Sequence, residues 1–231
     1  AILGSDVTGA KGINSSFGFY NHEPFKEFIT PWGQSVLVPE GFRTTEERNG
    51  DLLIYPGGDK QAKPSGRMAK AAYFFDAIIR QPVIEEDKLT PGDNLEEYGL
   101  LSDADLEYWT TTTRKARETG KAVIASPGGT ALGDIAHIPG IKLKNPRGIR
   151  DITEWYMSIL IRPDLVRSIF ERQTEIALEN LSKLFAAIGD QMDAIYICGT
   201  DFGTQDSTFC SPEQFHELWL PSYHKINGWI H

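Results

Sequence analysis

The clearest pattern of apolar and polar positions lies in the second half of the chain. Residues 163–188 place apolar side chains three and four positions apart, which is the period of a helix with one buried face. The positions expected on this face are Val166, Ile169, Phe170, Ala177, Leu181, Leu184, Phe185 and Ile188. Gly189 is expected to end the helix. Two short apolar runs, 122–125 and 194–198, have the length and composition of buried strands.

Capping residues and prolines predict further helices around these strands. A helix is expected over 102–119, where Gly120 ends it. A second helix is expected over 151–161, with an aspartate as its cap. A third begins after Ser211, which suits the N-cap position and is followed by a proline. Pro221 is expected to kink or break this last helix.

The first part of the chain has a different pattern. Residues 1–30 show no clear period and are expected to form loops. Three short strands are predicted within 31–59, at 35–38, 42–46 and 51–55. The last two are joined across Asn49-Gly50, a strong signal for a two-residue hairpin. We interpret this antiparallel meander as a scaffold or lid.

The order of elements predicts the fold class. From residue 102 onward, strands alternate with helices, which is typical of parallel βα units. We therefore expect an α/β fold, namely a partial (β/α)8 TIM-type barrel over 102–231 with an inserted antiparallel hairpin or meander at 31–59. The whole chain, 1–231, is expected to form a single domain. Because two βα units cannot close a barrel, we expect a fragment of a longer protein.

Composition and charge narrow the class of partner. The net charge is −9 without any block of lysine and arginine, which argues against nucleic acid or an anionic membrane as the main partner. No apolar run has the length of a membrane span, and no signal peptide is visible. Two cysteines do not make a disulfide framework, so a cytoplasmic location is expected. A small-molecule substrate fits these properties.

Candidate functional residues follow the second apolar strand. Ligands of parallel α/β folds bind beyond the carboxyl ends of the strands. Asp201 lies there and is the expected catalytic residue, either as a base or as a carboxylate that orients a polar substrate group. The alternative is an aspartate that caps its own loop. Gln205 and Asp206 lie further along this loop, and Gln205 is expected to bind substrate, although both residues also suit a turn.

The turn after the first apolar strand is a second candidate. Its glycines allow a ligand to approach the backbone and direct amides toward an anion. Ser126, Gly128 and Gly129 are therefore expected to bind substrate, although a tight turn into the next helix explains them equally well. Asp134 and His137 would suit acid–base chemistry if they lay one helical turn apart, but a structural role is favoured.

No metal site is expected in this chain. Cys198 and Cys210 lack the spaced cysteine and histidine partners of a zinc site. His216, His224 and His231 recur on roughly one helical side, but a proline interrupts that helix. Surface or packing roles are therefore favoured for these histidines.

Several motifs resemble the uroporphyrinogen decarboxylase superfamily. The first set lies near the C-terminus and comprises Asp193-Ala194-Ile195, Asp201, Ser211-Pro212-Glu213-x-Phe215 and Pro221-x-Tyr223-x-x-Ile226. Residues 123–129 resemble the family's strand that ends in a glycine pair. Residues 31–34, the hairpin and residues 64–68 resemble the branch of corrinoid-dependent methyltransferase-like proteins. The resemblance covers most of the chain and is more specific to the superfamily than to the reaction.

The resemblance implies a (β/α)8 barrel in which Asp201 and the turn at 126–129 lie near the substrate. Methyltransferases of the family hold zinc through a His-x-Cys pair and a later cysteine, and the zinc activates a thiol that accepts a methyl group from a corrinoid protein. No residue of this chain matches those ligands, which would lie after residue 231. We therefore expect no cofactor in this fragment, whereas the full-length protein would need zinc and a corrinoid protein.

The expected function follows from this resemblance. The chain is predicted to be part of an enzyme that moves a methyl group between a corrinoid, or a small methylated substrate, and a thiol, and to be inactive alone. One alternative is a tetrapyrrole carboxy-lyase, although the arginine-rich motif of true decarboxylases does not appear here. Another is a non-enzymatic binding or assembly remnant of the barrel. Open edges of the parallel sheet predict a homo-oligomer.

Overall fold

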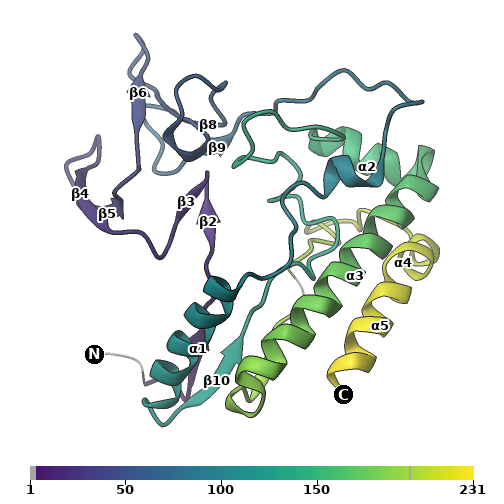
Figure 1. Ribbon diagram of the computed structural model, residues 1–231. Coiled ribbons are helices and arrows are strands. Elements are labelled where there is room, and N and C mark those ends of the chain that lie inside the picture. The colour runs from purple at the N-terminus through teal and green to yellow at the C-terminus, as the bar shows by residue number, and fades with distance from the viewer. Residues whose placement is uncertain (1–3, 198) are drawn as a thin grey trace. The chain divides into compact units, whose positions relative to one another are not determined.

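The computed structural model describes residues 4–197 and 199–231, and the chain divides into two compact units (Figure 1). Unit 1 comprises residues 1–13, 90–135 and 156–231, and unit 2 comprises residues 14–89 and 136–155. The fold is mixed α/β, with several small sheets and five α-helices among the described residues. These residues form no closed barrel. None of the described helices is long and apolar enough to cross a membrane.

A three-stranded parallel sheet forms the centre of unit 1. Its strands are β1 (Val7–Ala10), β10 (Ala122–Ala125) and β11 (Ala194–Ile195), in the order β1-β10-β11. The strand predicted at 122–125 is confirmed. The strand predicted at 194–198 is shorter, because Tyr196 and Ile197 lie beyond its end and Cys198 lies outside the described residues.

The prediction of loop for the start of the chain is wrong at β1. Val7 pairs with Ala122 and Ala10 with Ala125, so this segment is a strand because β10 lies beside it. Val7 and Thr8 favour a strand, but the glycine and alanine that follow them do not. The pairing partner therefore determines the conformation of this segment.

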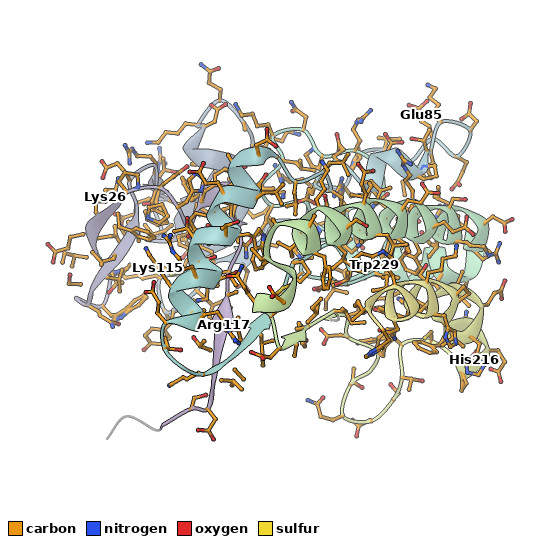
Figure 2. All side chains as sticks on the ribbon, turned by 60° about the horizontal axis from the view of Figure 1, so that its bottom comes forward. Lys26, Glu85, Lys115, Arg117, His216 and Trp229 are labelled. Atoms are coloured by element: carbon orange, nitrogen blue, oxygen red, sulfur yellow. The ribbon has the colours of Figure 1, made fainter. Side chains whose placement is uncertain are left out.

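The edge where β10 and β11 begin is held by an ion pair and a hydrogen bond. The Asp193 carboxylate accepts a hydrogen bond of 2.7 Å from the Val123 amide and pairs with Arg117 at 2.8 Å. Figure 2 shows Arg117 at the end of α1 (Asp103–Arg117). The hydrogen bond to the Val123 amide and the charge of Arg117 lower the pKa of Asp193. This contact ties α1 to two strands of the sheet.

Helix α1 begins and ends as its sequence predicts. The Ser102 hydroxyl accepts the Asp105 amide, and the Asp105 carboxylate accepts the Ser102 amide in return, which completes a capping box. Gly120 adopts a φ of 70°, which favours glycine after a helix. A core cluster connects α1, the sheet and α3 (Figure 1). Its buried residues are Ala10, Trp109, Ala116, Val123, Ala125, Leu184 and Ile188.

Helix α3 (Pro163–Ile188) lies between β10 and β11 in the chain, as predicted, and Gly189 follows it. The expected buried face is confirmed except at Phe185, which is 54% exposed. Phe185 instead contacts Trp229 of α5 (Leu220–Ile230) edge to face at 5.9 Å, and Figure 2 shows Trp229 beside α3. Gln173 is buried on α3, although its polarity predicts exposure.

The last helix breaks where its proline predicts. Helix α4 (Pro212–Leu218) ends immediately before α5, and Trp219 lies at the junction. Ser211 caps α4 by accepting the Gln214 amide at 3.2 Å. The residues of this segment that are buried against the rest of unit 1 are Leu218, Trp219, Ser222, Tyr223 and Ile226.

Helix α2 (Ile152–Ile161) begins in unit 2 and ends in unit 1. Its predicted cap is present, because the Asp151 carboxylate accepts the Glu154 amide at 2.9 Å. Short 3-10 helices are also present, namely η1 (Pro56–Gly58) in unit 2, and η2 (Pro91–Asn94) and η3 (Gly189–Gln191) in unit 1.

Unit 2 is built from small antiparallel sheets. Its strands are β2 (Ser15–Ser16), β3 (Phe19–Tyr20), β4 (Phe25–Ile29), β5 (Ser35–Pro39), β6 (Thr44–Glu46), β7 (Leu52–Ile54), β8 (Gly66–Met68) and β9 (Asp76–Ala77). β2 pairs with β3, β4 pairs with β5, and the others form a sheet in the order β6-β7-β8-β9. The hairpin predicted across Asn49-Gly50 is confirmed, and Gly50 adopts a φ of 87°. Its turn is longer than the two residues expected, because the Glu47 amide donates to the Asp51 carbonyl at 2.8 Å.

The predicted meander differs in one pairing. The strand at 35–38 was expected beside the strand at 42–46, but β5 pairs with β4 instead. Residues 25–29 belong to the segment 1–30, for which the absence of a clear period predicts loop, so that prediction is wrong here as well. β8 and β9 extend the meander on its other side.

Candidate functional site

The loops that follow β10 and β11 contact each other at the carboxyl ends of these strands. The Thr200 hydroxyl donates a hydrogen bond of 3.0 Å to the Leu132 carbonyl. A side-chain carbon placed on Gly199 would lie 3.5 Å from Oδ2 of Asp134, so this carboxylate lies close to the second loop. Trp219 also donates its indole N–H to the Leu132 carbonyl, at 2.9 Å. Leu132 thus receives one hydrogen bond from the second loop and one from the start of α5.

Helix α3 holds the glycine turn after β10. Gly128 and Gly129 adopt φ values of 76° and 75°, and two successive residues of this kind favour glycine strongly. The Gln173 side-chain amide donates to the Gly129 carbonyl at 2.8 Å. Ser126 and Gly128 are exposed, whereas Gly129 is half-buried beneath the turn. The expected substrate-binding residues of this turn therefore share one short segment, whose shape depends on a buried glutamine.

The loop after β11 carries Asp201 near its base and Gln205 at its tip. An antiparallel bridge between Gly203 and Thr208 closes the tip. Asp201, Gln205 and the neighbouring Asp206 are all exposed. Gln205 and Asp206 thus lie on the far side of the bridge from Asp201, and this separates the two groups of polar residues.

Tyr156 joins this site, although the sequence analysis did not select it. It lies on α2, and its ring packs against Phe209 with a centroid distance of 4.6 Å and an interplanar angle of 30°. Its hydroxyl oxygen is buried and has no hydrogen-bond partner among the described residues. Burial raises the pKa of Tyr156, and the charges of Asp201 and Asp134 raise it further. The phenol therefore remains protonated at neutral pH.

Cys210 follows Phe209 in the same loop, and its side chain is a protonated thiol. Burial raises the pKa of the Cys210 thiol, which keeps it in the protonated, weakly nucleophilic form at neutral pH. The other cysteine, Cys198, lies outside the described residues. In the part of the chain that the structure describes, no three His, Cys, Asp or Glu side chains are placed to hold a metal ion. These residues therefore do not fit the zinc that the resemblance implies.

The candidate histidines are exposed and lie outside this group of residues. The segment 131–140 forms turns rather than a helix, so Asp134 and His137 do not take the one-turn helical arrangement that acid–base chemistry would have suited. His216, His224 and His231 are exposed, and Figure 2 shows His216 on the outer side of α4.

The geometry combines a neutral proton donor with carboxylates. Tyr156 can donate a hydrogen bond to a bound group, and Asp201 can accept a proton or attract a positive charge. Sequence reasoning missed Tyr156 because an aromatic residue on an apolar helix usually belongs to the core. The only sequence signal was its hydroxyl group on a helix in which most other residues are apolar.

Comparisons of the chain with family models, with curated proteins and with solved structures find no significant match in any of the three. The resemblance to the uroporphyrinogen decarboxylase superfamily therefore stays a prediction that rests on the quoted motifs.

Proposed function

We propose that the chain supplies central βα units of a uroporphyrinogen decarboxylase-like methyltransferase with a partial (β/α)8 barrel. The support is the parallel sheet, in which α3 connects β10 to β11 and both strands end at the same edge. The observation that carries the proposal is that two groups meet the loop that bears Asp201: Asp134 lies close to Gly199 at its start, and the Tyr156 ring packs on Phe209 near its end.

The proposed reaction moves a methyl group between a corrinoid, or a small methylated substrate, and a thiol. Asp201 would orient a polar group of the substrate or take its proton, and Tyr156 would donate a hydrogen bond to it. The turn at Gly128 and Gly129 would position the substrate through the exposed backbone of Gly128. Since the described residues do not fit zinc, we assign them only the binding and orientation of the substrate.

One feature favours a second candidate, a tetrapyrrole carboxy-lyase. Such a reaction passes through a protonated pyrrole, whose positive charge is stabilised by nearby carboxylates. Asp134 and Asp201 supply two carboxylates whose charges raise the pKa of the Tyr156 phenol. This set of groups needs no metal to stabilise a cation.

Ligand binding tests both candidates, because the chain alone is expected to be inactive. The chain is titrated with methylcobalamin and, separately, with uroporphyrin, and binding is followed by the quenching of tryptophan fluorescence. Asp201→Asn should weaken the binding of the true ligand class by about tenfold, which is about 1.4 kcal/mol. Asp206→Asn is the matched control, because Asp206 is exposed on the same loop beyond the bridge.

The outcomes separate the proposals. Methylcobalamin binding that depends on Asp201 supports the methyltransferase, and uroporphyrin binding with this dependence supports the carboxy-lyase. Binding of neither ligand, or equal effects of the two substitutions, overturns both and leaves a binding or assembly remnant.

A further inference from the structure

The hairpin of β4 and β5 has an alternating ladder that determines which backbone groups point outward. The Thr30 amide donates to the Gln34 carbonyl at 2.9 Å, and the Glu40 amide donates to the Pro24 carbonyl at 2.7 Å. Hydrogen-bonded pairs alternate along an antiparallel ladder, so the pair at Glu27 and Leu37 is not hydrogen-bonded. The amide and carbonyl groups of Leu37 therefore point away from β4.

The outer edge of β5 is open. The sheet contains only β4 and β5 among the described residues, and Figure 1 shows no further strand beside them. The Leu37 side chain is 72% exposed. A two-stranded hairpin is at best marginally stable by itself, and an open edge is a template for another strand.

The two faces of the hairpin differ. Phe28 lies on the inner face and contacts Phe42 edge to face at 5.1 Å, next to the core cluster of unit 2. Side chains of the opposite face include Phe25, Ile29 and Leu37, which are 51%, 58% and 72% exposed. Glu27 and Ser35 lie on this face as well, since Glu27 pairs with Leu37 and Ser35 with Ile29. Exposed apolar side chains beside an open edge are typical of a surface that binds another strand.

The residue pattern selects a second copy of β5 as the partner of this edge. β5 reads Ser-Val-Leu-Val-Pro and carries no charge. When two copies of β5 pair antiparallel about Leu37, leucine faces leucine and Val36 faces Val38. The same pairing about the centre of β4 would place two Glu27 carboxylates directly opposite each other, which destabilises a sheet. The charge pattern thus favours self-pairing at β5 over self-pairing at β4.

We propose that two copies of this chain associate through the outer edge of β5 and form a continuous four-stranded antiparallel sheet with two-fold symmetry. The Leu37 amide of each copy donates to the Leu37 carbonyl of the other. The Ser35 amide of each copy donates to the Pro39 carbonyl of the other. The ladder ends at Pro39, because proline has no N–H group to donate.

The oligomeric state in solution tests this proposal. Light scattering after size exclusion is expected to give a dimer for the unmodified chain. Leu37→Lys should raise the dissociation constant by about tenfold or more, because the pairing would place two ammonium groups opposite each other. Ile29→Lys is the matched control, since it makes the same change at an exposed residue on the same face of β4. Circular dichroism checks that both variants fold.

A monomer at about 100 μM for the unmodified chain would overturn the proposal. Equal weakening by Leu37→Lys and Ile29→Lys would also overturn it, because association would then depend on the apolar face rather than on the β5 edge.

Cross-linking tests the register independently. In the proposed sheet, the two Leu37 residues form a hydrogen-bonded pair with Cα atoms about 5.5 Å apart, a distance that permits a disulfide. Leu37→Cys should therefore give a disulfide-linked dimer on mild oxidation. Val36→Cys should not, because Val36 faces Val38 of the other copy. Efficient cross-linking by both variants, or by neither, contradicts the register, and the unmodified chain controls for its native cysteines.

Discussion

Replacing Gln173 with methionine tests how the glycine turn of the candidate site is held. Gln173 is buried and donates to the Gly129 carbonyl at 2.8 Å. Methionine has a similar length and similar helix propensity, so the change removes the donor with little effect on α3 itself. A carbonyl that loses its partner in buried surroundings costs about 1–3 kcal/mol. For a domain of this size, that corresponds to a fall in Tm of roughly 2–12 °C.

The assay is thermal unfolding followed by circular dichroism at 222 nm. This signal reports mainly on unit 1, because α1, α3, α4 and α5 all belong to it. Gln205→Met makes the same chemical change at an exposed position, and its expected effect is within about 0.5 kcal/mol. If the two variants unfold at the same temperature, the Gln173 hydrogen bond does not stabilise the turn and the reasoning is refuted.

Three further predictions concern caps and titrating groups. Ser211→Ala removes the cap of α4 and should cost about 1 kcal/mol, which urea unfolding measures; an unchanged midpoint would contradict the cap. The pKa of Asp193 lies below its usual value chiefly because of the Val123 amide, so its stabilising effect exists above about pH 3.9 and is lost as the pH falls through the folded-state pKa. Asp193→Asn should therefore lower Tm at neutral pH, and the difference in Tm between the variant and the unmodified chain should become smaller in acid. A difference in Tm that does not change with pH would refute the assignment. Burial and then Asp201 raise the pKa of Tyr156, so Asp201→Asn should shift the phenol titration back toward its usual value of about 10. Ultraviolet difference titration against Tyr156→Phe measures this shift, and an unchanged titration would show that the two groups do not interact.

Local signals predicted the helices of this protein well. Ser102 and Gly120 mark the ends of α1, and Pro221 marks the break between α4 and α5. Caps and prolines act through neighbouring backbone groups, so the chain carries this information within a few residues. Phe185 was assigned wrongly because helical periodicity identifies a side of the helix but not the width of its contact with other elements.

Contacts between segments that are far apart in the chain could not be predicted from the sequence alone. β1 becomes a strand by pairing with β10, and β5 pairs with β4 rather than with β6. Asp201 was selected because it follows a predicted strand. Tyr156 was not selected, because its significance depends on a contact with Phe209 and on charges in two loops that are distant in the sequence.

The pairing of β1 with β10 has a consequence for synthesis on the ribosome. Val7 pairs with Ala122, which is 115 residues later in the chain. At a translation rate of about 5–20 residues per second, β10 is synthesised roughly 6–23 s after β1. Most of unit 2, including its antiparallel hairpins, is translated within this interval. The hairpins can therefore form while the N-terminal strand is still unpaired and open to chaperones.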